Sequence, residues 1–158
     1  SLNEHYIKSI DENELFELLK VFCQKFKKSI DSSRENSLLK SIKFLKNKAK
    51  TLEDIYINAQ YILNETIQVS TEDLKLLDTL SKKILKDFLN EYEKTSKISK
   101  DNLEKIVKGL IDKHKTNFKG VGQPLRIALT GSKFGPGIYD IILSLDKIRV
   151  VKRLKMIK

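Results

Sequence analysis

Hydrophobic positions along the chain recur every three or four residues, the spacing that places side chains on one face of an α-helix. Three stretches of this kind follow a strong helix start. Asp11 is an N-cap residue with Glu14 three positions later. Thr51 and Asp54 repeat that pairing, and Ser99 precedes the third stretch. The side chains predicted to face the core are Leu15, Leu18, Leu19, Phe22 and Phe26; Leu52, Ile55, Ala59, Ile62 and Leu63; and Leu103, Ile106, Val107 and Leu110.

Three more helices are predicted from similar signals. Ser33 is expected to start one of them, and Ser70 with Asp73 is expected to start the longest helix of the chain. Asp146 is the expected cap of the last helix. Their predicted inward residues are Leu38, Leu39, Ile42, Leu45 and Ala49; Leu74, Leu77, Leu80, Ile84, Phe88 and Tyr92; and Ile148, Val151, Leu154 and Ile157.

All six glycines and both prolines lie between Gly109 and Gly137. We expect Pro124 and Pro136 each to occupy the first turn of a helix, where a missing N–H costs nothing. Gly131 is expected to close the first of these helices in a left-handed conformation. No short segment alternates as a strand does. The pattern therefore predicts an all-α fold of about eight or nine helices with no significant sheet.

The polar segment 64–69 predicts a boundary between two packed helical subdomains, 1–66 and 67–158. One continuous bundle is the alternative. The chain begins with Ser1 instead of a methionine, so we expect it to be a piece of a longer protein. Its single cysteine, Cys23, allows no disulfide within the chain and favours a reducing, cytoplasmic location.

Composition adds a strong positive charge, since 31 Lys and Arg against 21 Asp and Glu give a net charge of +10. The lysines cluster at 25–50 and after Asp146, where no acidic residue follows. Such a field favours a polyanion, with a lysine-rich solvated surface as the alternative. A membrane partner is not expected, because no apolar run is long enough to cross a bilayer and the apolar helix faces are needed for the core.

No catalytic or metal-binding motif is recognisable. The run Thr130–Gly137 lacks the Gly-Lys-Ser/Thr ending of a phosphate-binding loop, and Leu125 stands where a dinucleotide fingerprint needs glycine. The two histidines, His5 and His114, lie far apart in the sequence and have no ligand-spaced companions. We therefore expect no metal and no cofactor in this chain.

The glycine- and proline-rich corner at 122–137 has chemistry suited to RNA. A helix that began at Pro124 would leave its first N–H groups free, with Arg126 projecting from the same turn. The turn at 132–137 would expose further backbone donors and acceptors. Such groups suit the edges of unstacked bases. A tight corner that needs glycine only for its backbone conformation is an equal alternative.

The corner also carries a family resemblance. The runs Val121-Gly122-Gln123-Pro124-Leu125-Arg126-Ile127-Ala128-Leu129-Thr130-Gly131-Ser132 and Gly135-Pro136-Gly137-Ile138-Tyr139-Asp140-Ile141-Ile142 resemble the C-terminal region of bacterial glutamyl-tRNA synthetases. That family ends in Gln-Pro-Leu-Arg, Ala-Leu-Thr-Gly, a Pro-Gly turn and a basic helix. The opening Leu2-Asn3-Glu4-His5-Tyr6-Ile7-Lys8 is similar to the family's Asn-x-x-Tyr-Ile segment, so the resemblance extends over the whole chain and is loose through 11–110.

The resemblance implies an α-helical anticodon-binding domain that holds the anticodon loop of tRNA-Glu, and of tRNA-Gln in some members. The parent enzyme would be a class I synthetase that uses ATP and Mg²⁺. Its two signature motifs are missing here, so the chain is expected to bind tRNA and to need a catalytic domain in cis, as a monomer. A stand-alone helical nucleic-acid-binding regulator and a helical protein-interaction scaffold are the alternatives.

The resemblance also implies roles for single residues. Arg126 matches the arginine that recognises an anticodon base, a task that suits a planar guanidinium. Ile138 matches an apolar residue that lies against the anticodon, and Gly135 replaces a threonine of a relative, which leaves backbone contacts only. Lys48 occupies the region that meets the third anticodon base, where arginine accompanies strict tRNA-Glu charging. Gln123 and Pro136 complete the expected anticodon-binding set, and Lys46, Lys50, Lys147, Lys152 and Arg153 are the expected contacts to the tRNA backbone.

Overall fold

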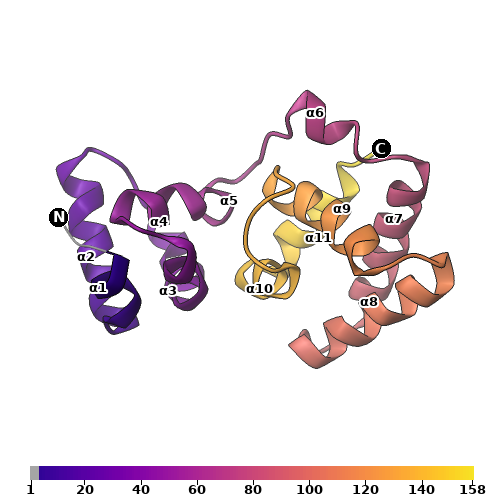
Figure 1. Cartoon of the computed structure of the whole chain (residues 1–158), viewed down its shortest axis with the longest axis horizontal. Helices are drawn as coiled ribbons and strands as arrows, with labels where there is room; N and C mark the ends of the chain where they lie inside the picture. The colour runs from indigo at the N-terminus through magenta and orange to yellow at the C-terminus, as the bar shows by residue number, and fades with distance from the viewer. Residues whose placement is uncertain (1–3) are drawn as a thin grey trace. The chain divides into compact units, whose positions relative to one another are not determined.

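The structure is a computed structural model that describes residues 4–158, and Leu2 and Asn3 of the opening motif lie outside these residues. Within the described part the chain forms eleven α-helices, two short 3₁₀-helices and no strand, which confirms the all-α fold (Figure 1). The expected number of helices was too low, because several predicted helices are interrupted by short breaks. The chain divides into two compact units, Ser1–Glu65 and Thr66–Lys158.

The helices of the first unit begin mostly where the sequence predicts. The Asp11 carboxylate accepts hydrogen bonds from the N–H groups of Asn13 and Glu14, and Thr51 with Asp54 forms a complete capping box. The start at Ser33 is wrong, because Asp31 caps a short 3₁₀-helix that precedes the next α-helix. The elements are α1 (Glu4–Ser9), α2 (Glu12–Lys25), η1 (Ser32–Arg34), α3 (Glu35–Leu45), η2 (Lys46–Lys48), α4 (Leu52–Asn58) and α5 (Gln60–Leu63).

The core of this unit lies between α2, α3, α4 and α5. On α2 the buried face differs from the prediction, since Phe26 is exposed while Phe16 and Cys23 are buried. The helix ends at Lys25, so Phe26 lies beyond the last residue that follows the helical spacing. Burial also raises the pKa of the Cys23 thiol. The largest fully buried side chains here are Ile7, Leu15, Leu19, Leu38, Ile42, Leu45, Ile55 and Ile62.

The second unit contains six helices, and the sequence predicts the starts of two of them correctly but misplaces the start of the longest. Ser99 and Asp146 cap helices as expected. Ser70 opens only a short helix, and the longest helix starts after Asp78, whose carboxylate accepts from the Ser81 N–H. The elements are α6 (Thr71–Leu74), α7 (Thr79–Lys94), α8 (Lys100–His114), α9 (Phe118–Thr130), α10 (Ile138–Ser144) and α11 (Lys147–Lys155). This second start explains why Leu74 and Leu80, predicted to be buried, are exposed.

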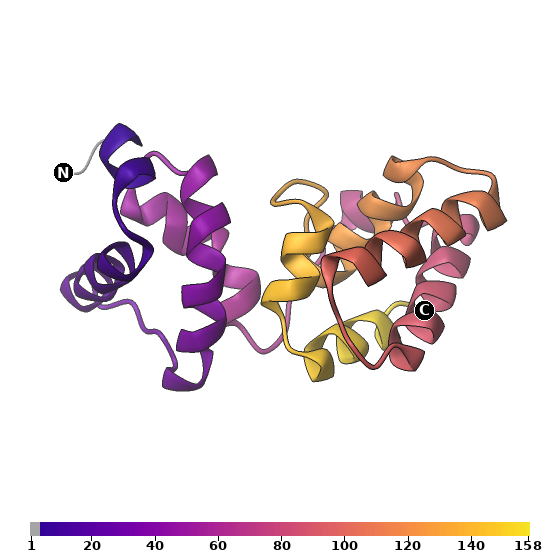
Figure 2. The same ribbon diagram turned by 90° about the horizontal axis from the view of Figure 1, so that it is seen from below.

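Helix α9 is the central element of this unit and contacts α7, α8, α10 and α11 (Figure 2). It begins at Phe118, where Asn117 accepts from the Gly120 N–H, so Pro124 lies buried inside the helix and not in its first turn. Pro136 is not in the first turn of a helix either, because it lies outside any helix, in the turn before α10. Gly131 closes α9 with a φ of 85°, as predicted.

The face that α11 buries differs in part from the expected one, since Leu154 is buried as predicted and Val150 is buried beside it. Ile148 is 80% exposed, whereas Arg149 and Arg153 are buried. The reason lies at the carboxyl end of α9, where the last carbonyl groups have no partner within the helix. Arg153 Nη1 donates to the Leu129 carbonyl oxygen at 2.7 Å. This hydrogen bond between α11 and α9 therefore contributes to the burial of Arg153.

Candidate nucleic-acid interface

The turn between α9 and α10, residues 131–137, is held by Arg126 of α9. Its Nε donates to the carbonyl oxygen of Pro136 at 3.1 Å, and its Nη1 lies 3.3 Å from the carbonyl oxygen of Lys133. Arg126 is half-buried, and this burial lowers the pKa of its guanidinium. The guanidinium has five N–H donors, so these two bonds leave others for a ligand.

Side chains of the turn itself satisfy much of the remaining backbone. Thr130 Oγ1 lies 2.8 Å from the Arg126 carbonyl oxygen and accepts from the Ser132 N–H at 3.2 Å. Ser132 Oγ in turn accepts from the Phe134 N–H at 3.1 Å. The expectation of freely exposed backbone carbonyls is therefore wrong at Lys133 and Pro136, whose oxygens are engaged by Arg126. Internal hydrogen bonds therefore hold the turn in one shape, and the turn offers fewer unpaired backbone groups than expected.

Phe134 lies in this turn, and its place there could not be recognised as a candidate contact from the sequence pattern. Its ring is 74% exposed, and the Lys133 ammonium lies 5.2 Å from the ring centroid. An exposed aromatic ring on an ordered turn is a stacking surface for an unpaired base, and an adjacent cation suits the phosphate next to it. The signal in the sequence was an aromatic residue among Ser, Gly and Pro, which has no helix face in which to be buried.

Three other residues of the expected anticodon-binding set lie near this turn. Ile138 is only 1% exposed, so the expectation of an apolar side chain open to the anticodon is wrong. Gly135 has a φ of +144°, a conformation that glycine adopts readily, and its missing Cβ would lie 3.9 Å from Cδ of Arg126. Gln123 is half-buried and lies three residues before Arg126, on the adjacent turn of α9.

The basic residues expected on α11 differ in their exposure. Lys147 and Lys152 are exposed, and the Lys147 ammonium lies 5.9 Å from the ring centroid of Tyr92. Burial, assisted by the charge of Asp146, raises the pKa of Tyr92 to about 12. Arg153 is buried against Leu129, as described above, so the expectation that it is a surface cation is wrong. Lys147 and Lys152 remain candidates for phosphate contacts.

In the first unit, Lys48 and Lys50 are exposed and Lys46 is not. The Lys46 ammonium donates to the carbonyl oxygen of Ile10 at 3.2 Å and lies 3.5 Å from Glu12. It therefore joins the α1–α2 junction to η2, and the expectation of a solvent-facing cation is wrong for Lys46. Lys48 has the exposure that a contact with an anticodon base needs, and Lys50 has the exposure that a phosphate contact needs.

Residues 4–158 contain neither a cluster of metal ligands nor a membrane-spanning helix. No group of three or more His, Cys, Asp or Glu side chains there could hold a metal ion. Within the same residues, no helix has both the length and the apolar character needed to cross a membrane. The chemistry that the turn and the exposed lysines offer is the binding of a polyanion with unstacked bases.

Comparisons with known proteins bear on this interface. A family model for an anticodon binding domain matches residues 13–158. The chain is 53% identical, over 98% of its length, to a glutamate–tRNA ligase of Pelagibacter ubique, and 29% identical to one of Wigglesworthia glossinidia brevipalpis. It covers 33% of each, so it spans about a third of these curated relatives. A solved glutamate tRNA ligase from Elizabethkingia meningosepticum shares the fold, with a TM-score of 0.81 at 16% identity over 99% of this chain and 31% of that one.

Proposed function

The chain belongs to the anticodon binding domain family, and from this premise we propose that it holds the anticodon loop of tRNA-Glu as part of a glutamate–tRNA ligase. The observation that carries the proposal is the turn at 131–137, where Arg126 supplies hydrogen-bond donors and bonds to the Lys133 carbonyl oxygen, and where the next residue, Phe134, supplies an exposed ring for stacking. Unpaired loop bases are recognised by this combination of stacking and edge contacts.

The placement of the side chains is the basis for assigning each residue a contact with an RNA base or with a phosphate. Arg126, Gln123, Lys48 and the backbone at Gly135 and Pro136 would contact anticodon bases. Lys50 of the first unit, with Lys147 and Lys152 of the second, would contact phosphates, which position the RNA without reading its sequence. Each of the two units, predicted as 1–66 and 67–158, would thus act as an anticodon-binding subdomain.

The remaining chemistry of the ligase would belong to another part of the protein. A catalytic domain in cis would bind ATP and Mg²⁺ and transfer glutamate to the tRNA, in a cytoplasmic and monomeric enzyme. The role of this chain in that enzyme would be limited to tRNA binding. The net charge of +10 would assist that role by attracting the tRNA backbone.

The test is a titration of the chain into fluorescently labelled tRNA-Glu, the same transcript with its anticodon bases replaced, and tRNA-Gln. We expect tRNA-Glu to bind at least about tenfold more tightly than the altered transcript, and all affinities to fall between about 50 and 200 mM salt. Equal binding of tRNA-Glu and the altered transcript would contradict anticodon recognition and favour a general nucleic-acid-binding protein. Absence of binding to every RNA would favour a protein-interaction scaffold.

A further inference from the structure

Helix α11 packs on α7 and α9 through one face and leaves its other face open to solvent. The packed face consists of four buried residues, Arg149, Val150, Arg153 and Leu154. On the open face Ile148 is 80% exposed, and Met156, directly after the helix, is 61% exposed. Two buried arginines and an exposed isoleucine on one helix are the reverse of the usual distribution. Large apolar side chains that are exposed together in this way indicate a contact surface.

A hollow of about 570 Å³, here called the outer groove, lies on this open face. Its lining residues form two rows with the i, i+4 spacing of a helix: Lys147, Val151 and Lys155 in one, and Ile148, Lys152 and Met156 in the other. Rows of this kind are the ridges of a helix surface, and the groove between two of them is where a ridge of another helix packs. The outer groove therefore has the form of an unoccupied helix-packing site.

Every charged side chain that lines the outer groove is a lysine. Helix α11 itself contains no acidic residue, and the Asp146 carboxylate before it accepts from the Arg149 N–H at 2.8 Å as the helix cap. The aliphatic stems of the lysines extend the apolar surface, while their ammonium groups make it positive. A partner that carries carboxylates beside apolar side chains complements both properties.

Three other occupants fit the outer groove less well. RNA phosphates would contact the lysines and leave Ile148, Val151 and Met156 exposed. A lipid surface suits a helix whose apolar and basic residues occupy separate faces, whereas apolar and basic residues alternate along both rows of the groove. A second copy of this chain would bring lysines against lysines, which repel one another. The acidic protein partner is the occupant that matches the apolar and the charged side chains together.

We propose that the outer groove binds an amphipathic helix of a partner protein, with glutamate or aspartate beside its apolar side chains. The apolar ridge of that helix packs against Ile148, Val151 and Met156, and its carboxylates pair with the groove lysines. The proposal does not rest on anticodon recognition. It adds a protein contact on a face of which Lys147 and Lys152 are also candidates for phosphate contacts.

The probe is a fluorescently labelled synthetic peptide of about 18 residues, long enough to form a helix by itself. It has leucines along one helix face, glutamates beside them and alanine elsewhere. A second peptide has the same composition with its leucines spread around the helix, and a third has lysine in place of every glutamate. Fluorescence anisotropy measures the affinity of each peptide for the 158-residue chain. We expect the first peptide to bind at least about tenfold more tightly than either of the others, because only it combines apolar burial with charge pairing.

Ile148→Ser tests the apolar contact. Ile148 is mostly exposed, and isoleucine and serine have similar helix propensities, so circular dichroism should show an unchanged fold. Binding of the acidic amphipathic peptide should weaken by about 5- to 10-fold, since an apolar side chain of the interface is lost. Met156→Gln, which keeps the length of the side chain, should weaken it as well. Ile57→Ser, at an exposed isoleucine of α4, is the matched control and should change nothing.

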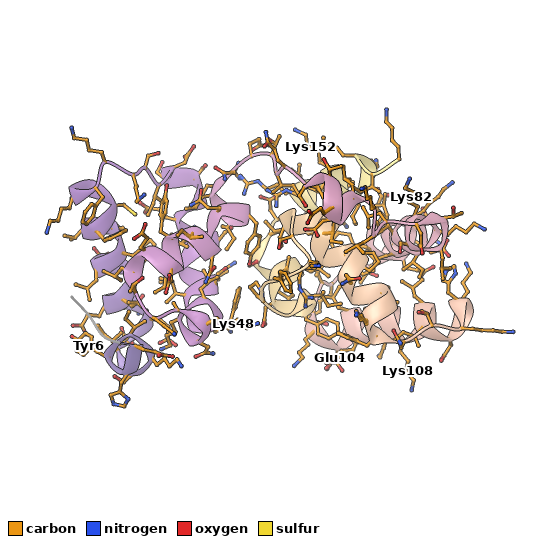
Figure 3. All side chains as sticks on the ribbon, turned by 45° about the horizontal axis from the view of Figure 1, so that its top comes forward. Tyr6, Lys48, Lys82, Glu104, Lys108 and Lys152 are labelled. Atoms are coloured by element: carbon orange, nitrogen blue, oxygen red, sulfur yellow. The ribbon has the colours of Figure 1, made fainter. Side chains whose placement is uncertain are left out.

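Lys155→Glu tests the charge. It should weaken binding of the glutamate peptide by about threefold or more and strengthen binding of the lysine peptide, a reversal that a loss of folding cannot produce. Lys108→Glu makes the same change of net charge on α8, and Lys108 lies away from Lys152 of α11 in Figure 3. This control should leave the binding of both peptides nearly unchanged.

The outcomes separate this proposal from the proposed function. Equal binding of the two glutamate peptides, or equal effects of the groove variants and their controls, would show that only the overall charge acts and would overturn the docking site. Without the peptide preference, a loss in Ile148→Ser of binding to phosphatidylglycerol vesicles would assign the groove to a lipid surface, and a loss of tRNA-Glu binding would assign it to the RNA. The predicted peptide preference in a chain that ignores the anticodon would support the docking site and contradict anticodon recognition alone.

Discussion

Arg126 donates from Nε to the carbonyl oxygen of Pro136 at 3.1 Å, across the turn that joins α9 to α10. The same guanidinium also reaches the Lys133 carbonyl oxygen. The arginine that the family resemblance assigns to base recognition therefore also sets the shape of the turn. Its loss would remove a base contact and loosen the segment that carries Phe134, and these two effects can be measured separately.

Arg126→Lys is expected to weaken binding of tRNA-Glu by about 10- to 100-fold. A lysine keeps the charge and cannot make the forked pair of contacts, and one good base contact is worth about 1–3 kcal/mol. Amide hydrogen exchange should become faster across residues 132–137, since two bonds to their carbonyls are lost. An unchanged affinity together with faster exchange would assign Arg126 to the turn alone.

Phe134→Ala is expected to weaken tRNA-Glu binding by about 5- to 100-fold with little change in thermal stability. The ring is mostly exposed, so its removal costs little packing, whereas stacking on one base contributes about 1–3 kcal/mol. Phe134→Tyr keeps a ring and should bind as the unaltered chain does. If Phe134→Ala bound normally in the fluorescence titration, the ring would not be a stacking surface.

The sequence predicts helix starts well wherever a cap acts through neighbouring residues. Asp11, Thr51, Ser99 and Asp146 each accept from an N–H two or three residues later, an interaction that is fully specified by local sequence. The start of the longest helix shows where such a prediction fails. Ser70 has the residue pattern of an N-cap and does cap a helix, but that helix is short, and the longest helix begins after Asp78 instead.

Which basic side chains face solvent could not be predicted from charge alone. Arg153 is buried because the Leu129 carbonyl, 24 residues earlier in the chain, needs a donor. Lys46 is held by Ile10 and Glu12, more than thirty residues earlier. Such contacts depend on how helices pack, and neither spacing nor composition records them. Local patterns therefore identified the family and the turn but assigned too many cations to the RNA-binding surface.

Two glycines of the second unit should respond oppositely to the same substitution. Gly131→Ala should lower the free energy of unfolding by about 2 kcal/mol or more, because its φ is +85° and a Cβ would lie 2.4 Å from the Gln68 carbonyl oxygen. Gly109→Ala, in the interior of α8 with nothing within 4 Å, should raise it by about 0.5–1 kcal/mol. Urea unfolding followed by circular dichroism measures both. A destabilising Gly109→Ala would contradict the open surroundings of that position.

The junction of α7 and α8 contains the clearest pH-sensitive contact of the second unit. Asp87 Oδ2 lies 2.9 Å from the Lys113 ammonium and 2.8 Å from His114 Nε2. The hydrogen bond from Lys113, with a further one from His114, holds the pKa of Asp87 below its ordinary value. A carboxyl group with a lowered pKa stabilises the folded state above its unfolded pKa of about 3.9, and this contribution disappears as the pH falls through the folded value.

Asp87→Asn is therefore expected to lower the stability of the chain by about 1 kcal/mol at pH 6, because a charged acceptor shared by two donors is replaced by a neutral amide. The difference from the unaltered chain should shrink as the pH falls below about 4 and vanish once the pH is below the lowered folded pKa of Asp87, where the carboxyl is protonated in the folded chain as well. Urea unfolding curves for both chains between pH 6 and pH 2 measure this difference. Glu93→Gln, at an exposed position of the same helix, is the control and should show no such convergence. A difference between Asp87→Asn and the unaltered chain that stayed constant down to the lowest pH would show that Asp87 acts through packing, and that its charge contributes nothing to the α7–α8 contact.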